Sequence, residues 1–85
     1  MRESASERTA KYFEATSASL KRLKNAKLPA TVAQSQLDYV LELVRGYAKD
    51  AQHYAEKRKP VTSLACIVYA EGLLDALKFL GLVDF

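Results

Sequence analysis

Residues 64–82, LACIVYAEGLLDALKFLGL, decide the fold of this chain. The segment is apolar on nearly every side, yet Glu71 and Asp75 lie in its middle, one helical turn apart. A membrane-spanning helix needs about 20 mainly apolar residues, and the charges of Glu71, Asp75 and Lys78 are unfavourable inside a bilayer. We therefore interpret the segment as the core helix of a soluble protein that does not enter a membrane.

The apolar surface of this helix is wider than two neighbouring helices can cover. Positions 64, 65, 68, 72, 76 and 79 form one face, and positions 67, 70, 74 and 77 widen it past half of the circumference. Some large side chains should stay exposed in a monomer, and we expect them among Ile67, Leu73, Leu74, Leu77 and Leu80. We interpret this remainder as a surface for self-association or for a protein partner, with Tyr69, Leu73 and Leu77 at the contact. The alternative is that the other helices enclose it completely.

Two further helices precede this one. The first, residues 4–26, starts at a capping box of Ser4 and Glu7 and ends before Pro29. Its apolar stripe is thin and rich in alanine and threonine, so this helix should be the least firmly held. The second, residues 32–58, follows a capping box of Thr31 and Gln34 and ends at basic residues that suit the negative end of the helix dipole.

The third helix, residues 60–80, starts at Pro60, whose missing N–H is not needed there, and Gly81 follows as its left-handed stop. Short connectors make successive helices alternate in direction. The sequence therefore predicts an all-α protein, a three-helix antiparallel (up-down-up) bundle, in which residues 1–85 form a single domain.

The composition excludes several classes of function. The net charge of +3 on 85 residues is too small to indicate a nucleic-acid binder. The single Cys66 excludes a disulfide framework and a Cys-based zinc site within one chain, and we expect it to be a small buried apolar side chain. Residues 1–13 contain no apolar stretch that would serve as a signal peptide, so we expect a cytoplasmic protein.

A few polar residues and one glycine are candidates for chemistry or binding. We interpret Glu71 and Asp75, which share a helix face, as structural polar contacts; partner recognition and a metal or acid–base role are the alternatives. Gly72 indicates a close helix approach, with a ring such as that of Tyr47 packed over it, or else a ligand crevice. His53 lacks a second His or Cys at ligand spacing. We expect no catalytic residue, no metal site and no cofactor.

A nucleic-acid-binding surface is the alternative function. Tyr39 and Tyr47, next to Arg45 and Lys49, suit base stacking beside phosphate contacts. However, the basic clusters at residues 21–27 and 57–59 fall at opposite ends of the predicted bundle, about 30 Å apart. Each cluster also suits the C-terminus of a helix. We therefore favour a small non-enzymatic module that binds itself or another protein.

Four short runs in and after the third helix form a distinctive pattern: Leu64-Ala65-Cys66-Ile67, Tyr69-Ala70, Gly72-Leu73-Leu74-Asp75-Ala76 and Leu80-Gly81-Leu82. Tyr47, Ala48, Ala51 and Tyr54 support it. The pattern, which covers roughly residues 37–83, resembles a small archaeal family of unknown function catalogued as family 357 (DUF357). The resemblance implies a helical, soluble, archaeal protein and no established activity.

A looser resemblance is to the helical HEPN domains, many of which are RNases that use a closely spaced Arg and His. Arg45 and His53 are eight positions apart, about 12 Å along a helix axis. This spacing departs from that motif, so we do not expect nuclease activity of this type.

Overall fold

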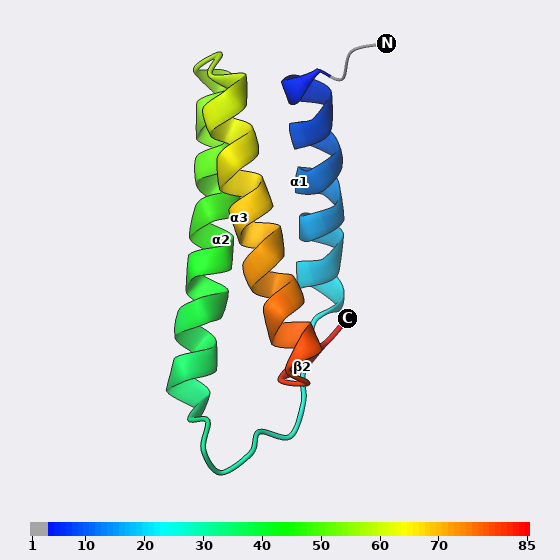
Figure 1. Ribbon diagram of the computed structural model, residues 1–85, viewed down its shortest axis with the longest axis vertical. Helices are drawn as coiled ribbons and strands as arrows, with labels where there is room; N and C mark the ends of the chain where they lie inside the picture. Colours follow the sequence, from blue (N-terminus) through cyan, green and yellow to red (C-terminus); the bar gives the residue numbers. More distant parts are fainter. Residues whose placement is uncertain (1–3) are drawn as a thin grey trace.

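The structure is a computed structural model that describes residues 4–85. Within these residues lie three helices, α1 (Ala5–Arg22), α2 (Gln34–Glu56) and α3 (Pro60–Phe79), and two very short strands, β1 (Lys24–Asn25) and β2 (Val83–Asp84). α1 and α3 run downward in Figure 1, and α2 runs upward. The molecule is elongated, with extents of 46 × 23 × 18 Å. The predicted all-α, up-down-up bundle is confirmed.

The first helix begins as predicted but ends earlier. The Ser4 Oγ accepts a hydrogen bond from the Glu7 N–H (3.4 Å), so Ser4 caps α1. α1 ends at Arg22, whereas the prediction extended it to residue 26. The chain leaves the helix because β1 pairs antiparallel with β2, with Asn25 opposite Val83. Because the paired segments are far apart in the chain, no local sequence pattern predicts this pairing.

The start of α2 also differs from the prediction. α2 begins at Gln34, and the expected capping box of Thr31 and Gln34 is not formed. Instead, the Gln36 Oε1 accepts a hydrogen bond from the N–H of Ala33, the N-cap residue (2.9 Å). The glutamine three residues beyond the cap therefore sets the start of α2, and the cap residue itself supplies no side-chain hydrogen bond.

The end of α3 is the predicted one. Gly81 has a left-handed backbone with φ of 73°, which glycine adopts without steric cost. The Gly81 N–H donates to the Lys78 carbonyl (2.9 Å), and the Leu82 N–H donates to the Leu77 carbonyl (3.0 Å). These two bonds form a Schellman motif, which turns the chain back so that Leu82 and Val83 are buried.

The end of α2 repeats this hydrogen-bond pattern without a glycine. The Arg58 N–H donates to the Ala55 carbonyl (3.1 Å), and the Lys59 N–H donates to the Tyr54 carbonyl (2.9 Å). Arg58 takes the left-handed position with φ of 59°, although a side chain there is unfavourable. Pro60 then opens α3 as its first residue, which confirms that prediction.

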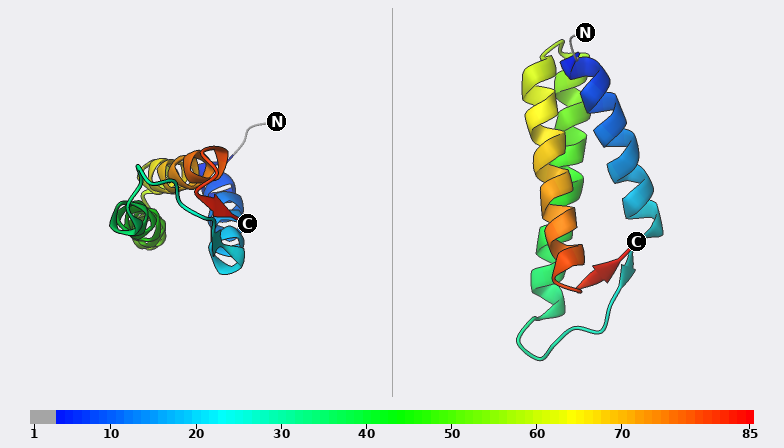
Figure 2. Two further views of the ribbon diagram at one scale, coloured as in Figure 1. Left: turned by 90° about the horizontal axis from the view of Figure 1, so that it is seen from below. Right: turned by 45° about the vertical axis from the view of Figure 1, so that its right-hand side comes forward.

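The central element is α3. It packs against both α1 and α2, whereas those two helices touch each other little, and in the left view of Figure 2 α3 lies at the corner between them. Its buried side chains are Ser63, Ile67, Ala70, Leu74 and Leu77. We expected the exposed side chains among Ile67, Leu73, Leu74, Leu77 and Leu80. Leu80 is 70% exposed as expected, whereas Ile67, Leu74 and Leu77 are buried. Ile67, Leu74 and Leu77 lie inward, where burial of their apolar surface stabilises the fold, and the small residues Gly72 and Ala76 lie on the opposite side of the helix.

The two flanking helices contribute unequally to this core. α2 buries five apolar side chains, Leu37, Leu41, Val44, Ala48 and Ala51. α1 fully buries only Thr9 and Thr16 among its described residues, and its larger apolar side chains are half-buried. The thin stripe that the sequence indicated for the first helix is thus present in the structure.

By length and composition alone, α3 is long and apolar enough to cross a bilayer, and within residues 4–85 it is the one helix of this kind. The core helix of a soluble protein meets the same criterion, so this feature is weak evidence for a membrane span.

Candidate functional site

The side of α3 that faces away from the core is exposed and entirely apolar. Val61 is 73% exposed and Phe79 is 84% exposed. The residues that form this side follow one another at spacings of three and four, and we call them the outer face: Val61, Ala65, Val68, Gly72, Ala76 and Phe79. No other helix within residues 4–85 covers it. The outer face is therefore a helix surface without a partner in the monomer.

The three predicted contact residues lie in different environments. Tyr69, at the edge of the outer face, is 53% exposed, and its ring centre lies 4.6 Å from that of Tyr47. Leu73 is half-buried and packs against the core. Leu77 is only 5% exposed because it lies one turn from Leu74 on the inner side of α3. A contact through Leu77 is thus incompatible with the folded chain, and this part of the prediction is wrong.

The space around Gly72 is open. A Cβ built at this position would meet no atom within 4 Å, so no helix of the described chain approaches it closely. Tyr47, which was expected to pack over Gly72, pairs with Tyr69 instead. The expected close approach at Gly72 is wrong for the monomer, and the glycine leaves room on the outer face.

Glu71 and Asp75 flank a small hollow between α1 and α3, together with Tyr12, Val68 and Gly72. Burial raises the pKa of Glu71, and the negative charge of Asp75 raises it further. The Glu71 Oε2 is buried and has no hydrogen-bond partner among the described residues. Within residues 4–85, no three His, Cys, Asp or Glu side chains gather closely enough to hold a metal ion. The pair is brought together as predicted, but without further ligands.

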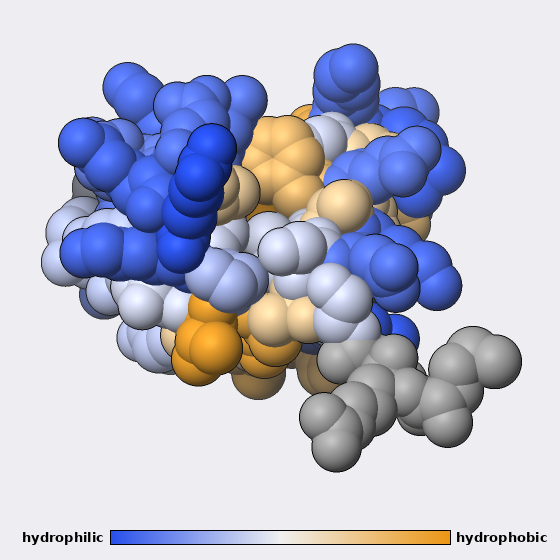
Figure 3. All heavy atoms as spheres, turned by 90° about the horizontal axis from the view of Figure 1, so that it is seen from above, coloured by the Kyte–Doolittle hydropathy of each residue, from blue (hydrophilic) through white to orange (hydrophobic). Residues whose placement is uncertain are grey.

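A groove of about 600 Å³ lies between α1 and α2, at the end of the molecule where α1 begins. Thr9 and Phe13 line it from α1, Ala51 and Ala55 line it from α2, and Arg58 lies at the turn that follows α2. Figure 3 looks onto this end and shows apolar surface in the middle, with hydrophilic side chains on both sides. The groove is the largest of the hollows described here, and the sequence did not predict it.

Comparison with known proteins places this architecture in a family. The family described as Protein of unknown function (DUF357) matches residues 11–83, which include most of α1 and all of α2, α3 and the final turn. The chain belongs to the DUF357 family. The predicted resemblance is confirmed, and the match extends into α1, beyond the residues that carried it. None of the curated proteins and none of the solved structures that were compared matches the chain.

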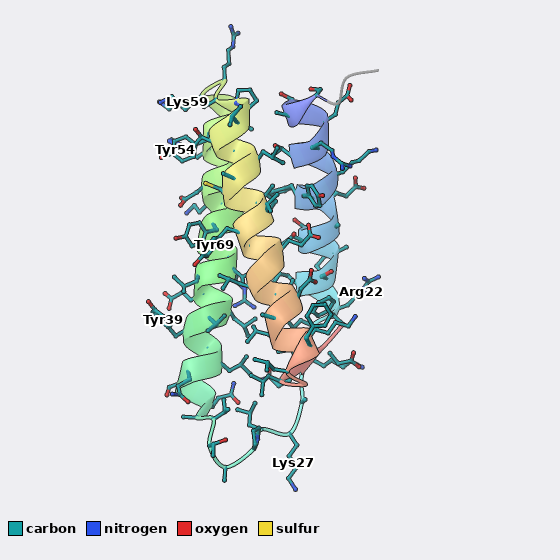
Figure 4. All side chains as sticks on the ribbon, in the orientation of Figure 1. Arg22, Lys27, Tyr39, Tyr54, Lys59 and Tyr69 are labelled. Carbon is teal, nitrogen blue, oxygen red and sulfur yellow. The ribbon has the colours of Figure 1, made fainter. Side chains whose placement is uncertain are left out.

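In this DUF357 protein, the residues considered for nucleic-acid binding do not form one surface. Tyr39 and Tyr47 line a hollow on α2 together with Glu42 and Asp50, whose carboxylates repel phosphate. Arg45 and Lys49 are one turn apart on a different side of α2 and are exposed. Lys59 also lies at the opposite end of the molecule from Lys27 (Figure 4). The tyrosines and the basic side chains are thus separated.

His53 and Cys66 of the DUF357 chain have ordinary surroundings. The exposed His53 ring contacts the edge of the Tyr54 ring, with 5.3 Å between the ring centres. Cys66 is a free thiol that is only half-buried, rather than buried as predicted. Burial raises the pKa of this thiol, and the negative charge of Asp50 adds to the effect. The thiol form is therefore favoured, which does not suit a nucleophile.

The lining of the groove in the DUF357 protein includes small side chains at helical spacing. Ala51 and Ala55 are one turn apart on α2, and Ala10 lies on the facing side of α1. Small side chains at helical spacing are typical of close helix packing, yet here Ala51 is fully buried whereas Ala55 stays exposed beside the groove. The spacing alone does not distinguish these two outcomes.

Proposed function

We infer that this DUF357 protein is a small non-enzymatic interaction module that packs the outer face of α3 against a helix of another chain. The partner we favour is another copy of the same protein. One observation carries the proposal: a complete side of the central helix is apolar and exposed. Contiguous apolar patches on soluble proteins are typical of interaction sites. The proposal places this module in the cytoplasm.

The size of the side chains along the outer face supports helix packing. Ala65, Gly72 and Ala76 are small, and the larger side chains of the face are Val61 and Phe79 at its two ends and Val68 between Ala65 and Gly72. Small residues allow two helix backbones to approach closely, and the large ones then pack beside the crossing. The open space at Gly72 is consistent with such an approach from outside the monomer.

The absence of charge on the outer face supports a second copy as the partner. None of its residues is ionisable, so nothing in the face selects a partner of opposite charge. In a dimer with two-fold symmetry the same patch is used twice, and an apolar patch is complementary to itself. The residues considered for nucleic-acid binding lie on separate surfaces, so no observation favours that function here.

Self-association is tested by analytical ultracentrifugation from about 10 μM to about 1 mM, a range that covers weak dimers. We expect the mass to rise above 9.5 kDa toward twice that value. Ala65→Glu, which places a charge on the outer face, should keep the chain monomeric and folded. Ala18→Glu, the same change on the exposed surface of α1, is the control and should leave association unchanged.

Two results would contradict the proposal. A mass of 9.5 kDa at every concentration removes the second copy as a partner. A dimer that persists in Ala65→Glu shows that α3 does not form the interface.

A further inference from the structure

We propose that the groove between α1 and α2 binds an amphipathic anion, a molecule with an apolar chain and one carboxylate or phosphate head group, and that Arg58 contacts the head group. This site is separate from the outer face of α3 and goes beyond the proposed function. Three observations carry it: an unfilled space of suitable size, a lining in which the one ionisable side chain is an arginine, and the backbone position of that arginine, which favours glycine.

The groove is an unfilled part of the space between α1 and α2. At the lower end of the molecule, β1 and β2 lie between α1 and the other two helices (Figure 2), and Leu82 and Val83 are buried there. At the upper end no segment of residues 4–85 takes this place. The space of about 600 Å³ falls within the range of small-molecule sites, about 300–1,000 Å³.

The walls of the groove suit an apolar chain. Phe13 and Ala10 on α1 face Ala51 and Ala55 on α2. The hydroxyl group of Ser63, at the base, is already satisfied, because it donates a hydrogen bond to the Ala51 carbonyl. The walls therefore offer mainly carbon surface, which favours an apolar ligand over a polar one.

The charge at the groove selects an anion. Arg58 is the one ionisable residue among the described residues that line it, and the exposed Lys57 and Lys59 flank Arg58 in the chain. Glu7 and Glu56 also lie at this end of the molecule, but neither lines the groove. A guanidinium binds a carboxylate or a phosphate through two parallel hydrogen bonds.

The backbone of Arg58 marks it as unusual. A left-handed φ of 59° is sterically unfavourable at a residue with a side chain, and glycine is the common residue at this place in a Schellman motif. Backbone strain of this kind concentrates at functional sites. Glycine would relieve the strain but would remove the guanidinium from the groove.

The experiment measures binding of decanoate, decyl phosphate and the uncharged decanol by titration calorimetry, at concentrations below micelle formation. We expect decanoate or decyl phosphate to bind at least tenfold more tightly than decanol. Arg58→Gly should reduce that preference to within about twofold and should raise the melting temperature, because it removes the strain. Loss of fold therefore cannot explain the loss of binding.

Two further variants complete the test. Ala55→Leu fills the groove and should weaken binding of all three probes at least tenfold. Lys59→Gln removes a neighbouring charge that does not line the groove, and it should retain most of the preference for the anion. Any one of four results would overturn the proposal. Two concern the unchanged protein: equal binding of decanol and the anions, or no binding of either anion. Two concern the variants: an undiminished preference for the anion in Arg58→Gly, or undiminished binding of the probes in Ala55→Leu.

Discussion

Glu71 is the residue whose surroundings differ most from those of an ordinary surface carboxylate. It lies in the hollow between α1 and α3, where burial and the neighbouring Asp75 both raise its pKa. Its buried Oε2 has no hydrogen-bond partner within residues 4–85. The charged form is therefore less favourable in the folded chain than in the unfolded chain, and Glu71 opposes folding at neutral pH.

This gives a pH-dependent prediction for Glu71→Gln. The pKa of Glu71 in the folded chain lies above the ordinary value of 4.5 that applies in the unfolded chain. At pH values between these two pKa values the folded chain binds more protons than the unfolded chain, so stability falls as the pH rises from 4.5 through the pKa of the folded chain. Replacing Glu71 by the neutral glutamine should raise the stability and therefore the melting temperature at pH 7. Well below pH 4.5 the gain should vanish, since Glu71 is then neutral too.

Thermal melts followed by circular dichroism at pH 7 and at about pH 3.5 measure this difference. Glu42→Gln makes the same replacement at an exposed position on α2 and serves as the control for effects that are not specific to the surroundings of Glu71. An equal gain at both pH values, or a loss of stability at pH 7, would show that the charge of Glu71 is not the cause.

At the scale of the helices, the glycines have two different roles. Gly81 ends α3 with a positive φ. Gly46 and Gly72 lie within α2 and α3, are exposed, and have no neighbour that a Cβ would meet within 4 Å. The same substitution by alanine should therefore have opposite effects at the two kinds of position.

Gly81→Ala should lower the free energy of unfolding by about 1 kcal/mol or more, because an L-residue is strained in the left-handed region. Gly46→Ala should raise it by about 1 kcal/mol, since alanine is the better helix former and has room. Urea unfolding measures both values. A stabilising Gly81→Ala would show that the final turn does not adopt the Schellman geometry.

Gly72→Ala separates monomer stability from association. In the monomer it should stabilise α3 by about 1 kcal/mol, as Gly46→Ala stabilises α2. If the outer face packs against a second copy, the added methyl group should weaken the dimer, whereas Gly46→Ala should leave it unchanged. Sedimentation of both variants at one concentration makes the comparison, and equal dimer fractions would exclude Gly72 from the interface.

At the scale of the whole molecule, α1 is held less firmly than the pair of α2 and α3. It packs mainly against α3 and touches α2 little. The side chains it buries fully are threonines, and the Thr16 Oγ1 has no hydrogen-bond partner among the described residues. Less apolar burial means less free energy to oppose local opening.

We therefore expect backbone amides in the middle of α1 to exchange with solvent at least about tenfold faster than those in the middle of α2 and α3. Hydrogen exchange followed by NMR at several pH values gives these rates residue by residue. Uniform protection of all three helices would show that the bundle opens only as one unit.

The number, order and direction of the helices, and most of their ends, could be predicted from the sequence. Ser4, Pro60 and Gly81 act on backbone groups within a few residues, and the chain between them needs no distant partner to show its helical period. The family membership could also be read from the α3 pattern, because that pattern is continuous in the chain.

Three features depend on tertiary packing and could not be predicted from the sequence: which side of α3 faces the core, where α1 ends, and the groove between α1 and α2. α3 is apolar on nearly every side, so its orientation depends on which side chains fill the space between the other helices best: Ile67 and Leu74 face inward, and Gly72 faces outward. The end of α1 depends on β2, which lies at the other end of the chain. These features result from competition between distant segments for the same space, and a local pattern carries no information about that competition.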